Sequence, residues 1–475
     1  MTSETFPASI NTVGELRASG HVQRDVRDEI RSNLLSALRD GRDPWEGIVG
    51  FESTVVPQLE RALIAGHDVV LLGERGQGKT RLLRTLVNLL DEWTPVVAGS
   101  ELDEHPYEPI LPETLRRAAD LGDDLPVQWR HRSERYSEKL ATPDTSVADL
   151  VGDIDPMKVA QGRSLGDPET IHFGLIPRAH RGLIVINELP DLSERIQVSM
   201  LNVMEERDIQ VRGYSLRLPL DVLVLASANP EDYTNRGRII TPLKDRFGAE
   251  IRTHYPLELV DEVDVIEQEA DLVASVPEFL IEILARFTRY LREHPSIDQR
   301  SGVSARFSIA GAETVAAAAL HRAAITGEEP AVARPVDLES VIEVLRGKVE
   351  FESGEEGRER EILEYLLRKA TADAVRANLG GTDMGALVTL LESGDGVRTG
   401  DRIPAAEVIA AFDDDPAVTE LLEQLAAKLD LDEAEYASAL EFALEGLFLA
   451  RRIGKEPDER GRTVYRVDPE DLADR

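Results

Sequence analysis

Short apolar runs alternate with longer mixed stretches between residues 48 and 255. The runs at 68–72, 183–186 and 222–226 are rich in Val, Leu and Ile. Continuous apolar runs of this length are typical of strands buried on both faces, and the stretches between them have helical spacing. The pattern predicts an α/β fold in which helices cover both faces of a parallel sheet.

A helical period dominates on either side of this region. Before it, Val26, Ile30, Leu34 and Leu38 are spaced four apart; after it, amphipathic helices are predicted over 277–291, 308–324 and 337–349. Gly380-Gly381 marks a linker. We therefore expect four segments: an N-terminal helical segment at 1–45, the α/β core at 46–255, a helical domain with a connecting helix at 256–379, and an acidic, mostly helical domain at 380–475.

The last segment ends in a pattern that allows two interpretations. A helix predicted over 440–451 is followed by a polar turn at 458–461 and by alternating apolar and polar residues at 463–467. This is typical of a winged-helix ending, and equally of a helix capped by an incidental hairpin.

The net charge of the chain argues against some classes of binding partner. Its 475 residues hold 89 acidic and 54 basic side chains, a formal net charge of −35. Such a field repels phosphate backbones and anionic membranes, although a local arginine cluster can still act within a screening length of about 8 to 10 Å. Nucleic-acid binding is thus disfavoured.

Missing residue types and missing apolar segments exclude further classes of function. Cysteine is absent, which excludes disulfides, thiolate nucleophiles and cysteine-ligated zinc. No apolar run has the length of a signal peptide or a membrane span, so no membrane contact is expected and a cytoplasmic location is predicted.

A phosphate-binding loop follows the first apolar run. Its residues match GxxxxGK[ST] without a mismatch: Gly73, Glu74, Arg75, Gly76, Gln77, Gly78, Lys79 and Thr80. A strand precedes the loop and a helix follows it, which is the context that brings backbone N–H groups onto phosphate. The motif predicts ATP and Mg²⁺ as cofactors, with Lys79 on the β- and γ-phosphates and Thr80 on the metal.

The second apolar run ends in Asn187-Glu188. A hydrolysing P-loop enzyme needs an acidic residue near Mg²⁺ and a base that orients water, and an apolar strand ending in Asp-Glu normally supplies both. Glu188 is placed to be the base. Asn187 stands at the metal-facing position without a negative charge, so the sequence predicts weaker metal affinity or turnover than Asp would give.

Three further polar residues complete an ordered set. Asn229 follows the third apolar run, Arg246 lies in the sequence Asp-Arg-Phe, and Arg306 stands at the head of a predicted helix. Guanidinium groups suit the charge that develops on a γ-phosphate. The order in which these parts occur is that of AAA+ ATPases.

Segments between these motifs resemble a particular AAA+ branch, the ATPase subunit of magnesium chelatase and the MoxR-type ATPases. The similarity covers roughly residues 48–324 and is carried by 149–155, by 173–182 and by 206–218, which alternates like the hairpin before sensor 1. The resemblance implies an AAA+ core at 46–255 and a lid domain at 256–379. It makes Asn229 sensor 1, Arg246 a finger acting in trans and Arg306 sensor 2. Asn187 departs from the usual Asp.

The resemblance also implies a homo-hexameric ring, because a head-to-tail contact must close to avoid a filament. It further implies that ATP hydrolysis drives the remodelling of a partner protein. Metal insertion with a partner that has a von Willebrand A domain is one form of this work. Two alternatives stay open: a nucleic-acid motor, for which Arg207, Arg212 and Arg217 could line a pore, and a nucleotide-gated scaffold with little hydrolysis. Arg236 or Arg238 could replace Arg246 as the finger. A sigma-factor activator is disfavoured because a GAFTGA loop is missing.

Overall fold

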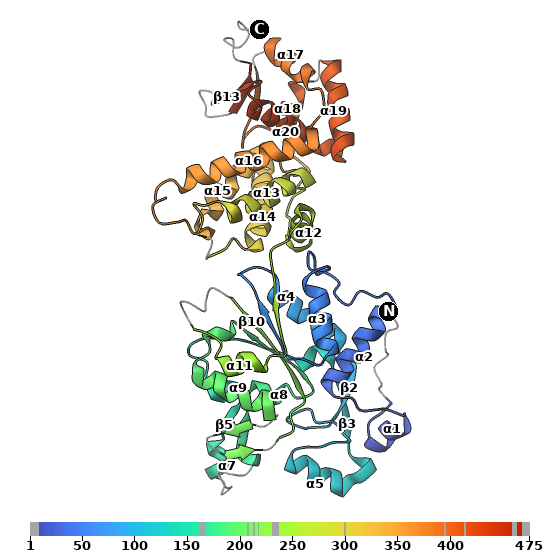
Figure 1. Ribbon diagram of the computed structural model, residues 1–475. Coiled ribbons are helices and arrows are strands. Elements are labelled where there is room, and N and C mark those ends of the chain that lie inside the picture. Colours follow the sequence, from blue (N-terminus) through green and yellow to red (C-terminus); the bar gives the residue numbers. More distant parts are fainter. Residues whose placement is uncertain are drawn as a thin grey trace. The chain divides into compact units, whose positions relative to one another are not determined.

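The computed structural model describes residues 9–160, 168–206, 209–211, 214–216, 218–229, 237–298, 301–393, 396–412, 415–457 and 463–467. The chain divides into two compact units, residues 1–254 and 255–475 (Figure 1). Within the described residues, none of the helices combines the length and the apolar character needed to cross a bilayer.

The first unit is built on a five-stranded sheet with the strand order β11-β1-β10-β7-β4, and every neighbouring pair is parallel. The α/β prediction is confirmed. The three apolar runs form the central strands, whereas the two edge strands, which carry more polar residues, were not predicted. The strands are β1 (Val69–Leu72), β4 (Tyr136–Leu140), β7 (Gly182–Asn187), β10 (Val222–Ala228) and β11 (Ala249–Arg252).

Alternate residues of the central strands face two different cores. Val69 and Leu71 belong to one buried cluster with Leu183 and Val185, and their sequence neighbours belong to another. Helices therefore cover both faces (Figure 1). The first cluster also takes in α2 (Val26–Arg39), α3 (Val55–Ile64), α4 (Lys79–Thr85) and the 3₁₀ helix η1 (Leu86–Leu89); the second takes in α6 (Val147–Leu150), α8 (Leu175–Arg178), α9 (Glu194–Glu206) and α11 (Thr241–Arg246).

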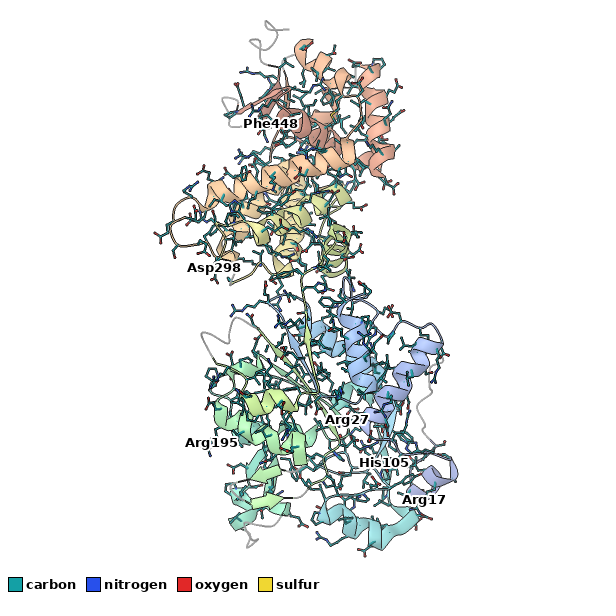
Figure 2. All side chains as sticks on the ribbon, viewed as in Figure 1. Arg17, Arg27, His105, Arg195, Asp298 and Phe448 are labelled. Atoms are coloured by element: carbon teal, nitrogen blue, oxygen red, sulfur yellow. The ribbon has the colours of Figure 1, made fainter. Side chains whose placement is uncertain are left out.

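Buried ion pairs attach the N-terminal helix α2 to this core. Both guanidinium Nη atoms of Arg135 donate to the Glu29 carboxylate at 2.7 Å, and both side chains are almost completely buried. Arg27, labelled in Figure 2, donates to Asp68 at 2.7 Å. Because a buried charge without its partner is strongly destabilising, these pairs fix where α2 lies.

Smaller elements surround the sheet. Three two-stranded antiparallel sheets pair β2 with β3, β5 with β6 and β8 with β9, and the last pair is the hairpin expected within 206–218. The strands are β2 (Trp93–Val97), β3 (Val127–His131), β5 (Gly152–Ile154), β6 (Ile171–Phe173), β8 (Ile209–Val211) and β9 (Tyr214–Leu216). The helices are α1 (Val13–Ala18), α5 (Pro112–Leu121), α7 (Pro156–Ala160) and the 3₁₀ helices η2 (Gly122–Asp124), η3 (Arg132–Arg135), η4 (Pro168–Thr170) and η5 (Leu189–Asp191).

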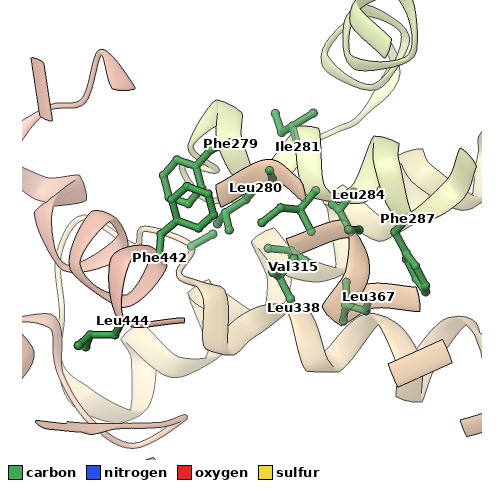
Figure 3. Close-up of a cluster of buried hydrophobic side chains, with 14 of the residues drawn as sticks. Phe279, Leu280, Ile281, Leu284, Phe287, Val315, Leu338, Leu367, Phe442 and Leu444 are labelled. Atoms are coloured by element: carbon green, nitrogen blue, oxygen red, sulfur yellow. The ribbon is translucent and has the colours of Figure 1, made fainter. Parts of the chain in front are cut away.

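The second unit is mostly helical. A large buried cluster spans residues 263–465, and a smaller one gathers around Ile403, Val408 and Ala437. Phe279 and Phe442 stack with their ring centroids 4.4 Å apart, and Leu284, Val315 and Leu367 belong to the same cluster (Figure 3). Since these residues come from both 256–379 and 380–475, the two predicted domains share buried apolar surface, and their division stays a prediction. The helices up to residue 380 are α12 (Leu259–Glu269), α13 (Glu278–Glu293), α14 (Ala305–Thr326), η6 (Pro335–Leu338), α15 (Glu339–Leu345), η7 (Arg346–Lys348) and α16 (Glu359–Leu379).

The end of the chain forms a three-stranded antiparallel sheet with the order β12-β14-β13. The pairing of β14 with β12 as well as with β13 favours the winged-helix interpretation, because an incidental hairpin would pair only with itself. Strand β12 has three residues, too few to be predicted from alternation. The elements are α17 (Gly385–Ser393), β12 (Val397–Thr399), α18 (Ala405–Ala410), α19 (Pro416–Leu429), η8 (Glu433–Glu435), α20 (Tyr436–Leu449), β13 (Gly454–Pro457) and β14 (Thr463–Arg466).

Candidate nucleotide site

The carboxyl ends of the parallel strands bring the predicted motifs to one edge of the sheet. The loop 73–80 follows β1, Glu188 follows β7, and Asn229 follows β10, which lies between the other two strands. The N–H of Gly73 donates to the carbonyl of Ala228 at 3.1 Å, which links the loop to the end of β10. Ligands of open parallel sheets bind at this edge, so the geometry agrees with a nucleotide site.

The loop 73–80 has the backbone shape that its glycines permit. Gly76 and Gly78 have φ values of 73° and 72°, in the left-handed region that a side chain disfavours. The buried Lys79 opens α4 and donates from Nζ to the carbonyls of Gly73, at 2.5 Å, and Glu74, at 2.7 Å. The loop therefore curls around its own lysine, and the ammonium group lies inside the curl.

Two side chains close this curl: Gln77 of the loop itself, and Thr253, which the sequence analysis did not single out. The Gln77 carbonyl oxygen accepts from the N–H of Glu74 at 3.1 Å and from Thr253 Oγ1 at 2.8 Å. Thr253 follows β11, and its N–H donates to the carbonyl of Leu72 at 2.7 Å. The shape of the loop thus depends on a residue 176 positions further along the chain than Gln77.

We expect Gly73→Ala to destabilise the first unit by about 1–3 kcal/mol and to abolish ATP binding, because an added methyl group overpacks the loop. A Cβ at this position would lie 1.9 Å from Thr253 Oγ1 and 2.3 Å from Gln77 Oε1. Thermal unfolding and ATP titration measure the two effects. Gly347→Ala is the matched control because a Cβ there meets nothing within 4 Å. Equal behaviour of the two variants would contradict the packing argument.

The loop also meets the end of β7. Thr80 Oγ1 donates to Asn187 Oδ1 at 3.4 Å, and Ser227 Oγ donates to the same oxygen at 3.0 Å. Glu188 comes next and has φ 54° and ψ 48°, and its N–H donates to Ser227 Oγ at 3.4 Å. A left-handed non-glycine residue is strained and concentrates at functional sites, which supports a role for Glu188.

Glu138 on β4 is a polar residue of this site that the sequence analysis missed. Its Oε1 accepts from Asn187 Nδ2 at 2.7 Å, and its carboxylate also pairs with Arg84. The hydrogen bond from Arg84 lowers the pKa of the Glu138 carboxyl, so this group is charged at neutral pH. In the sequence it belongs to a polar five-residue strand, and only the pairing of β4 with β7 places it beside Asn187.

For the other predicted residues, the structure gives burial and local contacts. Asn229 is buried at the end of β10. Arg246 ends α11 and pairs with Glu205 at 2.6 Å, and Arg238 is exposed. Arg306 is exposed in the first turn of α14, in the second unit, so its relation to the loop stays a prediction. Arg207, Arg212, Arg217 and Arg236 lie outside the described residues.

Comparison with known proteins identifies related chains over this region. The family model of the sigma-54 interaction domain matches residues 162–246. The magnesium-chelatase subunit ChlI of Nostoc sp. is 28% identical over 244 residues, which cover 50% of this chain and 61% of that protein. Chloroplastic ChlI-2 of Arabidopsis thaliana is 28% identical over 280 residues, 55% of this chain and 62% of that one. This chain resembles the AAA+ subunit of magnesium chelatase.

The extent of the resemblance is limited. The chain spans less than two thirds of the length of these relatives. A cryo-EM-based structure of the complex between magnesium-chelatase subunits BchI and BchD is 21% identical and covers 67% of this chain and 98% of that one. Its TM-score of 0.35 is too low to carry an argument. The roles of the residues around the loop 73–80 therefore rest on their own contacts.

These residues fit Mg²⁺ and a nucleoside triphosphate. The curled loop offers backbone N–H groups and an ammonium group to phosphate oxygens. Thr80 Oγ1 and Asn187 Oδ1 are the neutral oxygen ligands that Mg²⁺ accepts. Among the described residues, no three His, Asp or Glu side chains gather closely enough to hold a metal ion. A Mg²⁺ ion here would take phosphate oxygens as ligands together with Thr80 and Asn187. It would neutralise negative charge on the phosphates.

Proposed function

We propose that this chain is an ATP-hydrolysing subunit of an AAA+ ring motor of magnesium-chelatase or MoxR type. The contact between Thr80 and Asn187 carries the proposal, since it joins the phosphate loop to the end of strand β7, 107 residues further along the chain. Lys79 and the loop bind the phosphates, Glu188 activates water, and Asn229 orients it. Arg246 and Arg306 stabilise the developing charge, one from a neighbouring subunit and the other from the same chain.

The work of this motor is the remodelling of a partner protein. The magnesium-chelatase relatives support a motor of chelatase type, and metal insertion with a von Willebrand A domain partner is the specific form we propose. A closed ring follows from a finger that acts in trans, because a head-to-tail contact must close on itself to avoid a filament. The resemblance to magnesium chelatase suggests that this ring is a hexamer. We place the ring in the cytoplasm.

A nucleic-acid motor has less support. In the winged-helix interpretation α20 would be the recognition helix, yet ten of its residues are buried. It carries two Glu and no Lys or Arg. The scaffold alternative rests on Asn187 alone. Measured ATP turnover decides between the scaffold and the motor.

The test is complementation between two inactive variants. Lys79→Ala keeps Arg246 but loses the phosphate loop, and Arg246→Ala keeps the loop but loses the finger. In an equal mixture we expect ATPase activity of roughly a quarter of the parent's, the fraction of random interfaces that join an intact loop to an intact finger. Steady-state phosphate release measures it.

Arg238→Ala serves as the matched control, because Arg238 is the other described candidate finger and its side chain is exposed. We expect that variant to hydrolyse ATP alone. A mixture that regains no activity would show that Arg246 does not act in trans. A parent protein that hydrolyses ATP no faster than Lys79→Ala would overturn the motor proposal itself.

A further inference from the structure

The metal-facing position on β7 holds an amide, and a carboxylate on the neighbouring strand binds that amide. Strands β4 and β7 are parallel, with Leu140 opposite Asn187, so Glu138 lies two residues back on the same face of the sheet. Its Oε1 accepts from Asn187 Nδ2 at 2.7 Å. A P-loop enzyme normally has an acidic residue at the end of this strand. Here the nearest equivalent is Glu138, one strand away on β4.

This hydrogen bond determines which way the amide points. A charged carboxylate can only accept hydrogen bonds, so the NH₂ group of Asn187 must face Glu138. The amide oxygen must then face the other way, where the Thr80 hydroxyl lies at 3.4 Å and the Ser227 hydroxyl at 3.0 Å. Without Glu138 either end of the amide could face Thr80, because a hydroxyl group both donates and accepts.

Glu138 is itself fixed by the helix that carries Thr80. Arg84 lies one turn after Thr80 on α4 and donates to both oxygens of the Glu138 carboxylate, at 2.8 Å and 3.0 Å. Tyr136 donates its hydroxyl to Oε2 at 3.0 Å. Thr80, Asn187, Glu138 and Arg84 thus form a closed chain of contacts that begins and ends on α4, and a paired Arg and carboxylate hold their geometry well.

We propose that Glu138 is a positioning residue for Asn187, and that the acidic residue of the Mg²⁺ site is displaced here from β7 to β4. The proposal rests on the function proposed above. It reverses the expectation from sequence alone for Asn187→Asp. That variant by itself would set two carboxylates against each other at hydrogen-bonding distance, where each can only accept and neither can donate.

The test is an exchange of the acid and the amide. The parent, Asn187→Asp, Glu138→Gln and the double variant are titrated with ATP, once with Mg²⁺ and once with EDTA. We expect each single variant to lose about 10-fold of the Mg²⁺-dependent gain in affinity, as changes beside metal ligands typically do. In the double variant the new amide donates to the new carboxylate, so the gain should return to within about twofold of the parent's. Affinity in EDTA should be the same in all four proteins.

Glu134→Gln is the control, since Glu134 forms a surface ion pair with Arg130 at 3.1 Å. We expect it to behave as the parent does. The proposal is overturned if Asn187→Asp alone binds Mg·ATP as well as the parent, or if the double variant is no better than the weaker single one. Rescue separates positioning from damage to the fold, because a damaged fold gains nothing from a second substitution.

Thermal unfolding of the same four proteins without nucleotide gives a second measurement. If the parent binds no ATP at all, the proposed function fails. In that case the melting temperatures still show whether Glu138 positions Asn187. Recovery in the double variant supports the hold of Glu138 on Asn187, and additive losses overturn it.

Discussion

Replacing Lys79 with Ala should raise the dissociation constant for Mg·ATP by about 100-fold, because one charged hydrogen-bonding partner of the phosphates is lost, an effect of about 3 kcal/mol. The Lys79 ammonium is buried inside the curl of the phosphate loop, where it donates to the carbonyls of Gly73 and Glu74. Its position is thus set before any ligand binds, and little ordering of the side chain opposes the gain from a phosphate contact.

The measurement is a titration with a fluorescent ATP analogue in the presence of Mg²⁺. Lys244→Ala is the matched control, since Lys244 is half-exposed and pairs with Glu250 at 2.8 Å on the surface. Lys79→Met keeps the aliphatic stem and separates the loss of charge from the loss of volume. If Lys79→Met binds ATP as tightly as the parent, the phosphate loop is not the nucleotide site and every role assigned from it is wrong.

The predictable parts of the site are those whose signal lies in consecutive residues of the sequence. The loop 73–80 has a fixed spacing, and Glu188 and Asn229 each follow an apolar run typical of a buried strand. Because parallel strands end at one edge of a sheet, a linear pattern was enough to expect these residues together. In the structure they follow β1, β7 and β10, which are neighbours in the sheet.

The parts that were missed depend on pairing between strands. Glu138 lies on an edge strand whose polar residues give no apolar signal, and its place beside Asn187 follows only from the register of β4 with β7. Thr253 supports the loop from the end of β11, the other edge strand. The register of a parallel sheet is set by crossover helices and by the packing of both faces, which a single sequence does not display.

Replacing Glu188 with Gln should lower ATP turnover by about 10²- to 10⁴-fold, the usual contribution of a general base. The change removes a charge and keeps the shape, so the strained left-handed backbone at φ 54° has no new reason to relax. ATP affinity should therefore stay within about twofold of the parent's, which is the sign of a group that acts on the reaction and not on binding.

Single-turnover hydrolysis and an ATP titration separate these two quantities. Glu194→Gln is the matched control, since Glu194 is an exposed carboxylate at the start of α9. Under the proposed function, a subunit that holds ATP without hydrolysing it should also hold the partner that it remodels. A pull-down with Glu188→Gln and ATP should then retain a protein with a von Willebrand A domain. Retention of DNA-bound factors would favour the nucleic-acid motor, and turnover at the parental rate would show that Glu188 is not the base.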